Sequence, residues 1–204
     1  MAANGNLPAP LQDLVERLGR LPGLGPKSAL RMALAMLNWP EDRARDLGRA
    51  ILELRERVKI CSVCNGLADA DPCRLCADPT RDASQLCVVA EWDSLLALER
   101  GGFFQGRYLI LGGLLAPLDG VDARSLDTAK LRGRLAQGQV REVILGLGAT
   151  IDAENTASFV KNMIVRDFPA VRVTRLALGI PLGSEVKFMD QETLRQSLRH
   201  RQEL

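Results

Sequence analysis

Four of the five cysteines in this 204-residue chain lie within one short segment. They form two Cys-x-x-Cys pairs, Cys61 with Cys64 and Cys73 with Cys76, and eight residues separate the pairs. Each pair closes a tight knuckle that directs two thiolates at one point, and two knuckles supply the four sulfur ligands that structural zinc prefers. An iron–sulfur cluster and four unrelated buried thiols are the alternatives. The spacing therefore predicts one structural Zn²⁺ per chain, held in a small module.

The cysteine segment separates two stretches of different pattern. The stretch before it has apolar residues at helical spacing, with breaks at Pro22–Pro26 and Trp39-Pro40, and predicts three helices. After residue 85, short apolar runs alternate with helical stretches, which is typical of a parallel sheet covered on both faces. We therefore expect an α/β chain of several modules: a helical region, the zinc module, a parallel α/β sheet and a C-terminal loop and helix. The expected segments are 1–58, 59–80, 81–178 and 179–204. The four apolar runs are Leu86–Ala90, Tyr108–Leu111, Val140–Leu147 and Val171–Leu178.

Each of the three predicted helices in residues 1–58 has apolar residues at helical spacing, and in the first they are Leu11, Leu14, Val15, Leu18 and Leu21. Residues three and four apart lie on the same side of a helix, so such spacing predicts the face that packs against a neighbour. For the helix that begins at Pro26, the predicted face is Leu30, Ala33, Leu34 and Leu37. For the next helix it is Ala44, Leu47, Ile51, Leu54 and Val58.

The break between the first two helices has the composition of an anion site. Gly23 and Gly25 allow a tight turn, and the helix that begins at Pro26 directs unpaired N–H groups towards it. Lys27 and Arg31 are four residues apart and share one face, and no acid occurs from Arg17 to Pro40. The pattern predicts a helix-hairpin-helix that binds the DNA backbone without reading bases. A structural turn between helices and a solvated helix face are the alternatives.

Acidic residues follow two of the predicted strands. Asp152 and Glu154 come after the run that ends at Leu147, and Glu91 and Asp93 come after the run that ends at Ala90. Ligand-facing groups collect at the carboxyl ends of parallel strands, so these carboxylates are candidates for binding Mg²⁺ or a basic partner. The alternative is N-terminal capping of the following helices, which favours acids at the same positions.

Composition limits the class of protein. The chain lacks the roughly 18 unbroken apolar residues that span a bilayer, so we expect no membrane segment. Residues 1–10 carry neither a positive charge nor an apolar run, so we expect no secretory signal and a cytoplasmic location. Aromatic residues make up only 4% of the chain, which argues against base stacking as the main mode of nucleic-acid binding.

The order of these motifs resembles the RecR recombination-mediator family over almost the whole chain. The resemblance rests on a glycine hairpin, a four-cysteine module and a sheet followed by Asp-x-Glu, with several short segments in register. The sheet region looks like a Toprim domain, the fold shared with topoisomerases and bacterial primases. Besides the four cysteines, the segments that carry the resemblance are Leu21–Ala29, Asp78–Asp82, Ala97–Gly101, Pro117–Gly120 and Gly179–Ser184.

The resemblance implies a protein without catalytic activity. RecR proteins act with RecO, and in some settings with RecF, to help load RecA on single-stranded DNA covered by single-strand-binding protein. They form ring-like tetramers that can encircle DNA, with contacts in the N-terminal helical region and the C-terminal region. The alternative is a Mg²⁺-dependent Toprim nuclease or strand-cleaving enzyme. By the resemblance, Gly23, Gly25, Lys27 and Arg31 contact DNA, and the acidic surface of Asp152, Glu154, Glu91 and Asp93 binds RecO.

One position departs from the family pattern. Family members typically read Val-Val-Glu where this chain has Val88-Val89-Ala90. Glu91 and Asp93 are each displaced by one residue, and one step along a strand reverses the side-chain face. Ser94 also stands where the family usually has Asp. The departure argues against magnesium chemistry and favours a basic protein partner for the acids. The single tyrosine, Tyr108, begins a run expected to be buried, which makes it a poor nucleophile.

Overall fold

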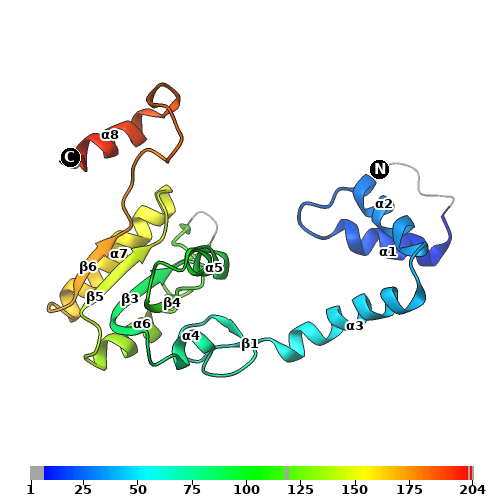
Figure 1. The fold of residues 1–204 in the computed structure, drawn as a ribbon, viewed down its shortest axis with the longest axis horizontal. Helices are drawn as coiled ribbons and strands as arrows, with labels where there is room; N and C mark the ends of the chain where they lie inside the picture. The colour runs from blue at the N-terminus through cyan, green and yellow to red at the C-terminus, as the bar shows by residue number, and fades with distance from the viewer. Residues whose placement is uncertain (1–6, 118–119, 202, 204) are drawn as a thin grey trace. The chain divides into compact units, whose positions relative to one another are not determined.

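The chain divides into two units, Met1–Arg57 and Val58–Leu204. The computed structural model describes residues 7–117, 120–201 and 203 (Figure 1). Leu118 and Asp119, which belong to the Pro117–Gly120 segment, lie outside the described residues.

The first unit contains a two-helix hairpin. Helix α1 (Ala9–Gly19) and helix α2 (Pro26–Leu37) both have proline in the first turn, where the missing N–H costs no hydrogen bond. Val15 of α1 is buried against Ala29 and Ala33 of α2, and these small side chains allow the two helices to approach closely.

The buried face of α2 differs from the predicted one. Ala33 and the partly buried Leu30 belong to it, as predicted, but Leu34 and Leu37 are exposed. Ala29 takes their place at the contact with α1. The reason is geometric: the apolar cluster that buries α2 contains residues of α1 and α2, and one neighbouring helix covers only a narrow stripe of a helix surface.

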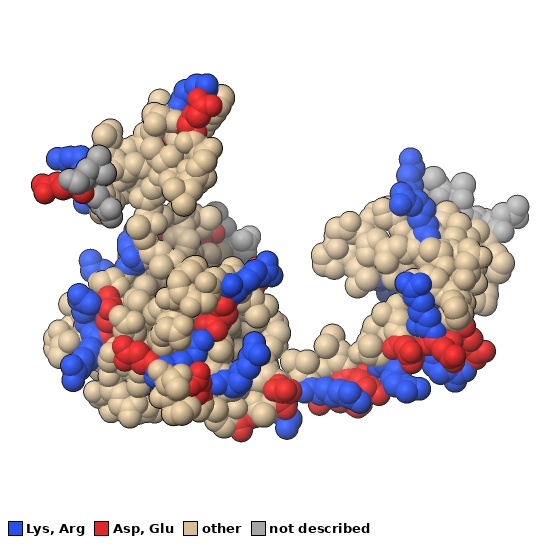
Figure 2. All heavy atoms as spheres, in the orientation of Figure 1, with Lys and Arg blue, Asp and Glu red and all other residues tan. Residues whose placement is uncertain are grey.

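Helix α3 (Glu41–Arg57) buries none of its residues. The predicted apolar stripe is present, but Leu47, Ile51 and Leu54 are all exposed, so the structure shows no partner for it in the described part of the chain. The helix is favoured instead by its charges, because acids occupy its first turn and arginines its last turn. Positive and negative side chains mix along its length (Figure 2).

The second unit is organised around a four-stranded sheet, and every neighbouring pair of its strands is parallel. The order in space is β4-β3-β5-β6, so the chain starts in an inner strand and builds outward to both sides. The parallel α/β prediction is therefore confirmed. The last strand is shorter than predicted because the chain leaves the sheet after Arg175. The strands are β3 (Asp82–Val89), β4 (Gly106–Ile110), β5 (Glu142–Gly146) and β6 (Arg172–Arg175).

Helices cover both faces of this sheet. Alternate residues of β3 point to opposite sides: Leu86 and Val88 belong to one core cluster, and Cys87 and Val89 to another. The first cluster lies under α6 (Thr128–Ala136) and α7 (Ile151–Asp167), and the second lies under α5 (Trp92–Gly101). Continuous burial of both faces explains the unbroken apolar runs in the sequence.

The cysteine segment contains more regular structure than its composition indicates. Strands β1 (Lys59–Ile60) and β2 (Leu67–Ala68) form a short antiparallel ribbon, and α4 (Arg74–Ala77) is a single helical turn. Leu75 packs both against the cysteines and against the core under α5. The module therefore adjoins the sheet on the same side as α5.

Residues after β6 form an extended segment that ends in a short 3₁₀ turn, η2 (Val186–Phe188), and helix α8 (Gln191–Arg199). Asp190 caps α8, because its carboxylate accepts a hydrogen bond from the Thr193 N–H. Large apolar side chains, including Leu182 and Phe188, are exposed here. In the described part of the chain, every helix is too short or too polar to cross a bilayer.

Candidate metal centre and nucleic-acid interface

The four sulfur atoms of the module converge on one point. The Sγ atoms of Cys61, Cys64, Cys73 and Cys76 all lie within 4.8 Å of one another, and the first three residues are buried. The Sγ atoms of Cys64 and Cys73 are 3.6 Å apart. A zinc tetrahedron with Zn–S bonds of about 2.3 Å has sulfur atoms about 3.8 Å apart. The sulfur positions therefore fit tetrahedral zinc.

Backbone groups support thiolates at this centre. The Gly66 N–H donates to Cys64 Sγ, and the Cys73 N–H donates to Cys61 Sγ, each over 3.3 Å. Hydrogen bonds from the Cys76 thiol and from the Gly66 N–H lower the pKa of Cys64 to about 5. The pKa of Cys76 is raised, because its thiol donates to Cys64, and burial raises the pKa of Cys73. The thiols thus oppose one another, since the thiolate of Cys64 makes deprotonation of its neighbours harder. A bound dication would stabilise all four thiolates and so remove this opposition.

All four ligand positions come from the protein, so the centre suits a structural metal. Asp71 joins the two knuckles: its carboxylate accepts from the Ser62 N–H over 2.8 Å and from the Ser62 hydroxyl over 2.9 Å. These hydrogen bonds lower the pKa of Asp71. The predicted zinc site is therefore present as a closed, internally braced cluster.

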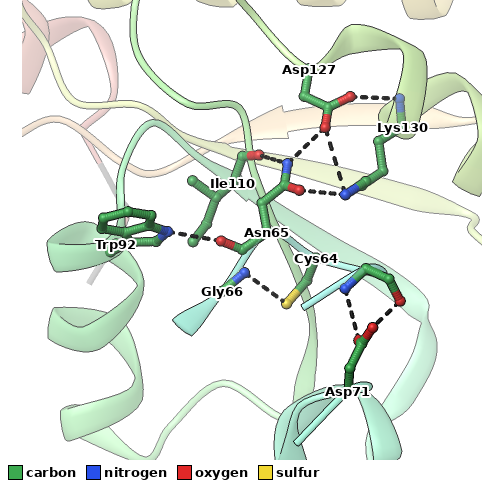
Figure 3. Close-up of polar contacts among 9 residues, drawn as sticks. Cys64, Asn65, Gly66, Asp71, Trp92, Ile110, Asp127 and Lys130 are labelled. Atoms are coloured by element: carbon green, nitrogen blue, oxygen red, sulfur yellow. Dashed lines mark hydrogen bonds and ion pairs between the residues drawn. The ribbon is translucent and has the colours of Figure 1, made fainter. Parts of the chain in front are cut away.

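Asn65 joins the metal centre to the sheet (Figure 3). Its Nδ2 donates to the Ile110 carbonyl and to Asp127 Oδ2, both over 2.9 Å, and its Oδ1 accepts from the Lys130 ammonium. Its own carbonyl accepts from Trp92 Nε1 over 2.8 Å. The backbone of Asn65 is left-handed, with φ of 63°, which asparagine tolerates better than most residues. The side chain of Asn65 thus binds β4 and the start of α6 to the first knuckle, and its backbone carbonyl binds α5.

The knuckle also covers an open sheet edge. Strand β4 is an edge strand, and the Ile110 N–H donates to the Cys64 carbonyl over 2.9 Å instead of remaining unpaired. Sequence reasoning did not assign a role to Asn65 or Trp92. The Asn65-Gly66 pair after the cysteine is a turn signal, but its partner Asp127 is 62 residues away, which no local pattern reveals.

The glycine hairpin has the geometry of an anion site. Gly23 has a φ of 78°, in the region where glycine is favoured, and Gly25 occupies the N-cap position of α2. Gly25 supplies no capping side chain, and the space around its Cα is open, so a ligand can approach the first turn of α2 closely. The first-turn N–H groups and the positive end of the helix dipole favour an anion there.

Lys27 and Arg31 lie exposed on α2. Neither forms an ion pair within the described residues, whereas Arg17 is held by Asp13 at 2.8 Å. Arg17 therefore contributes less positive charge at the hairpin than the acid-free stretch from Arg17 to Pro40 indicated. In Figure 2 the visible face of the hairpin is largely uncharged, with separate Lys and Arg side chains.

The two acid pairs follow adjacent strands, because β3 pairs directly with β5. Glu91 is the N-cap residue of α5 but makes no capping side-chain bond, and Asp152 and Glu154 lie in the first turn of α7. Thr150 caps α7 instead, with its hydroxyl accepting from the Ala153 N–H over 3.2 Å. Side-chain capping thus does not account for these three acids.

The acids do not form one cluster. Glu91 and Asp93 line a cavity beside α5, whereas Glu154 lines a different one beside α8. Glu154 also has a counter-charge, since both of its oxygens accept from Arg175. In the part of the chain that the structure describes, no three carboxylates lie close enough to share a metal ion.

Family models match consecutive parts of the chain. A model described as RecR, helix-hairpin-helix matches residues 11–55, and one described as the RecR zinc finger domain with four cysteines matches residues 58–78. A Toprim domain model matches residues 84–177, and a model described as RecR, C-terminal matches residues 179–202.

Curated relatives agree over nearly the full length. Recombination protein RecR of Nitratidesulfovibrio vulgaris is 62% identical over 97% of this chain and 98% of its own. The proteins of the same name from Maridesulfovibrio salexigens and Moorella thermoacetica are 54% and 43% identical, over 98% and 97% of this chain and 99% and 98% of their own. The chain belongs to the RecR family. The resemblance drawn from the motifs is thereby confirmed, and membership gives the chain a role in recombinational DNA repair.

Two nucleophilic side chains of this RecR protein are enclosed in the Toprim sheet. Tyr108 and Cys87 are both buried in the core under α5, and the sequence predicted this for Tyr108. Burial raises the pKa of each group, which keeps both protonated at neutral pH. Ala90, which stands where the family usually has glutamate, is also buried, at the end of β3. Its short side chain places no carboxylate at that position.

Proposed function

We propose that this RecR protein is a DNA-binding recombination mediator without catalytic activity. In this proposal it acts with RecO, and in some settings with RecF, to help load RecA on single-stranded DNA covered by single-strand-binding protein. The observation that carries the proposal is the exposed hairpin, with Lys27 and Arg31 beside an open helix N-terminus.

The hairpin supports binding to the phosphate backbone of DNA without regard to sequence. Gly23 and Gly25 let a phosphate approach the helix N-terminus, and the two cations add charge on the same face. Contacts of this kind position a duplex or a single strand but carry no base information.

Apolar surface at both ends of the chain supports a ring-like homotetramer. Helix α3 presents Leu47, Ile51 and Leu54 to solvent, and the C-terminal segment presents Leu182 and Phe188. Contiguous exposed apolar surface of this kind marks protein–protein contacts. We propose that segments 1–58 and 179–204 supply the subunit contacts, that 59–80 carries zinc, and that 81–178 binds partners.

The Toprim acids are proposed to bind RecO. Glu91 and Asp93 are exposed beside one cavity, and Asp152 and Glu154 begin α7 after the neighbouring strand. Separate carboxylates spread over the carboxyl-terminal end of the sheet suit a basic protein surface better than a single metal ion. Asp152→Ala with Glu154→Ala should weaken RecO capture at moderate salt and leave zinc content unchanged.

Arg175→Ala is the matched control for that double variant. It breaks the ion pair with Glu154 but leaves both acids in place. RecO capture by Arg175→Ala should equal that of the wild type. Undiminished capture by the double variant, or equal loss in the control, would remove these acids from the RecO interface.

The alternative function is a Mg²⁺-dependent Toprim nuclease or strand-cleaving enzyme. Ala90 in place of the family glutamate and the burial of the only tyrosine, Tyr108, both favour the mediator. Purified protein should leave single- and double-stranded DNA intact in the presence of Mg²⁺. Cleavage that disappears in Asp152→Ala would establish the enzyme instead.

The mediator proposal is tested by RecA loading. Single-stranded DNA is first covered with single-strand-binding protein, and RecA is added with RecO and this protein while DNA-dependent ATP hydrolysis by RecA is followed. The protein should shorten the lag before hydrolysis, and Lys27→Ala with Arg31→Ala should restore most of it. No change in the lag with the wild-type protein would contradict the proposal.

A further inference from the structure

A cavity of about 730 Å³ lies at the carboxyl ends of β3 and β4, between α5 and the first cysteine knuckle. We call it the α5 cavity. Leu111 and Gly112 follow β4, Glu91 follows β3, Asn65 belongs to the knuckle and Asp127 precedes α6, so four separate segments meet around it. Its size is within the range of cavities that hold ligands in proteins.

Large apolar side chains surround the α5 cavity and remain half in solvent. Trp92 is 45% exposed, Leu96 is 57% exposed and Ile60 is 59% exposed, and all three line the cavity. Trp92 is fixed in place, because its Nε1 donates to the Asn65 carbonyl over 2.8 Å (Figure 3). A fixed aromatic side chain beside an aliphatic one is the typical anchor of a protein–protein interface.

The charged groups that line this cavity are all acidic. Glu91, Asp93 and Asp127 contribute carboxylates, and neither lysine nor arginine is among the lining residues in the described chain. The nearby Lys130 is engaged, since its ammonium donates to Asn65 Oδ1 and lies 3.7 Å from Asp127. Acids around an apolar centre repel phosphate and attract cationic side chains, which excludes nucleic acid and favours a basic polypeptide.

We propose that the α5 cavity is a docking site for a basic segment of a partner protein, with a bulky apolar side chain seated between Trp92 and Leu96. This inference rests on the proposed function in taking RecO as the protein that supplies the segment. It adds an apolar anchor to an interface otherwise assigned to charges, and the zinc module contributes Ile60 and Asn65 to the lining of the cavity. The zinc module thereby becomes part of the partner surface.

The test measures the affinity of purified RecO for full-length variants by surface plasmon resonance. Leu96→Gln keeps a good helix former of similar length but removes the apolar wall. Val165→Gln is the matched control, because Val165 is 54% exposed and lies on α7, on the opposite face of the sheet. Leu96→Gln should weaken binding about tenfold or more, and Val165→Gln should stay within about twofold of the wild type. Zinc content and mass by light scattering should not change.

Two outcomes would overturn the inference while the proposed function stands. In the first, RecO binds the wild type and Leu96→Gln equally. In the second, Leu96→Gln changes the mass by light scattering, which would show that another copy of the chain covers the cavity.

If RecO fails to bind the wild type, the proposed partner is wrong, and the cavity is tested separately. Trp39→Phe leaves Trp92 as the single tryptophan. The probe is the peptide acetyl-Lys-Lys-Leu-Phe-Lys-Lys-amide. It should shift Trp92 emission to the blue in a saturable way, and Leu96→Gln should abolish the shift. No shift in the Trp39→Phe protein would contradict the inference.

Discussion

Replacement of Asn65 by alanine should release the first cysteine knuckle from the sheet. The variant loses the hydrogen bond to the Ile110 carbonyl, worth about 1 kcal/mol. It also loses the bonds to Asp127 and Lys130, which together contribute about 1 kcal/mol because they are partly in solvent. Alanine in the left-handed backbone costs about 1 kcal/mol more. The free energy of local opening should therefore fall by about 3 kcal/mol.

Hydrogen–deuterium exchange measures this opening directly. The amides to follow are those of Ile110, which donates to Cys64, and of Gly66, which donates to a cysteine sulfur. A change of about 3 kcal/mol corresponds to about 100-fold faster exchange in peptides that cover residues 61–67 and 106–112. Peptides from Met1–Arg57 should exchange as in the wild type, because they belong to the other compact unit.

Asn155→Ala is the matched control for this experiment. Asn155 is exposed in α7, so its replacement should change exchange in those peptides by less than about threefold. If Asn65→Ala also stays within about threefold of the wild type, the contacts of Asn65 do not hold the knuckle on the sheet.

Three further predictions concern metal, capping and pH. Freshly purified protein should contain one zinc per chain by mass spectrometry, and Cys64→Ser should bring it below half; wild-type zinc far below one equivalent would contradict the site. Thr150→Ala should destabilise the protein to urea by about 1 kcal/mol through loss of the α7 cap, and no change would show that the cap is unimportant. Hydrogen bonds from Arg166 and Arg132 lower the pKa of Asp167 to about 2, from about 4 in unfolded chains. Asp167→Asn should therefore reduce thermal stability at pH 7, and its difference from the wild type should vanish as pH falls from about 4 to 2; a constant difference would contradict this.

The sequence predicted the metal centre because its signal is local. Two Cys-x-x-Cys pairs place four sulfurs together whatever surrounds them, and the structure brings the same four atoms within 4.8 Å. Unbroken apolar runs likewise predicted the parallel sheet, since both faces of β3 are buried.

The remaining features depend on contacts that periodicity does not encode. Helical spacing marked Leu47, Ile51 and Leu54 as an apolar face, but spacing alone does not say whether the partner is in the same chain, and here the face is exposed. Leu34 of α2 is exposed because Ala29 packs closer to α1. The role of Asn65 was not predicted because its partners come from three distant elements.

The central claim is that the hairpin binds the DNA backbone, and the salt dependence of DNA affinity tests it most directly. Each phosphate contact releases counterions and contributes about one unit to the slope of log K against log salt. Lys27→Ala with Arg31→Ala should lower affinity equally for every sequence and reduce the slope by about two. An unchanged slope in the double variant would place the DNA interface elsewhere on the molecule and contradict the account.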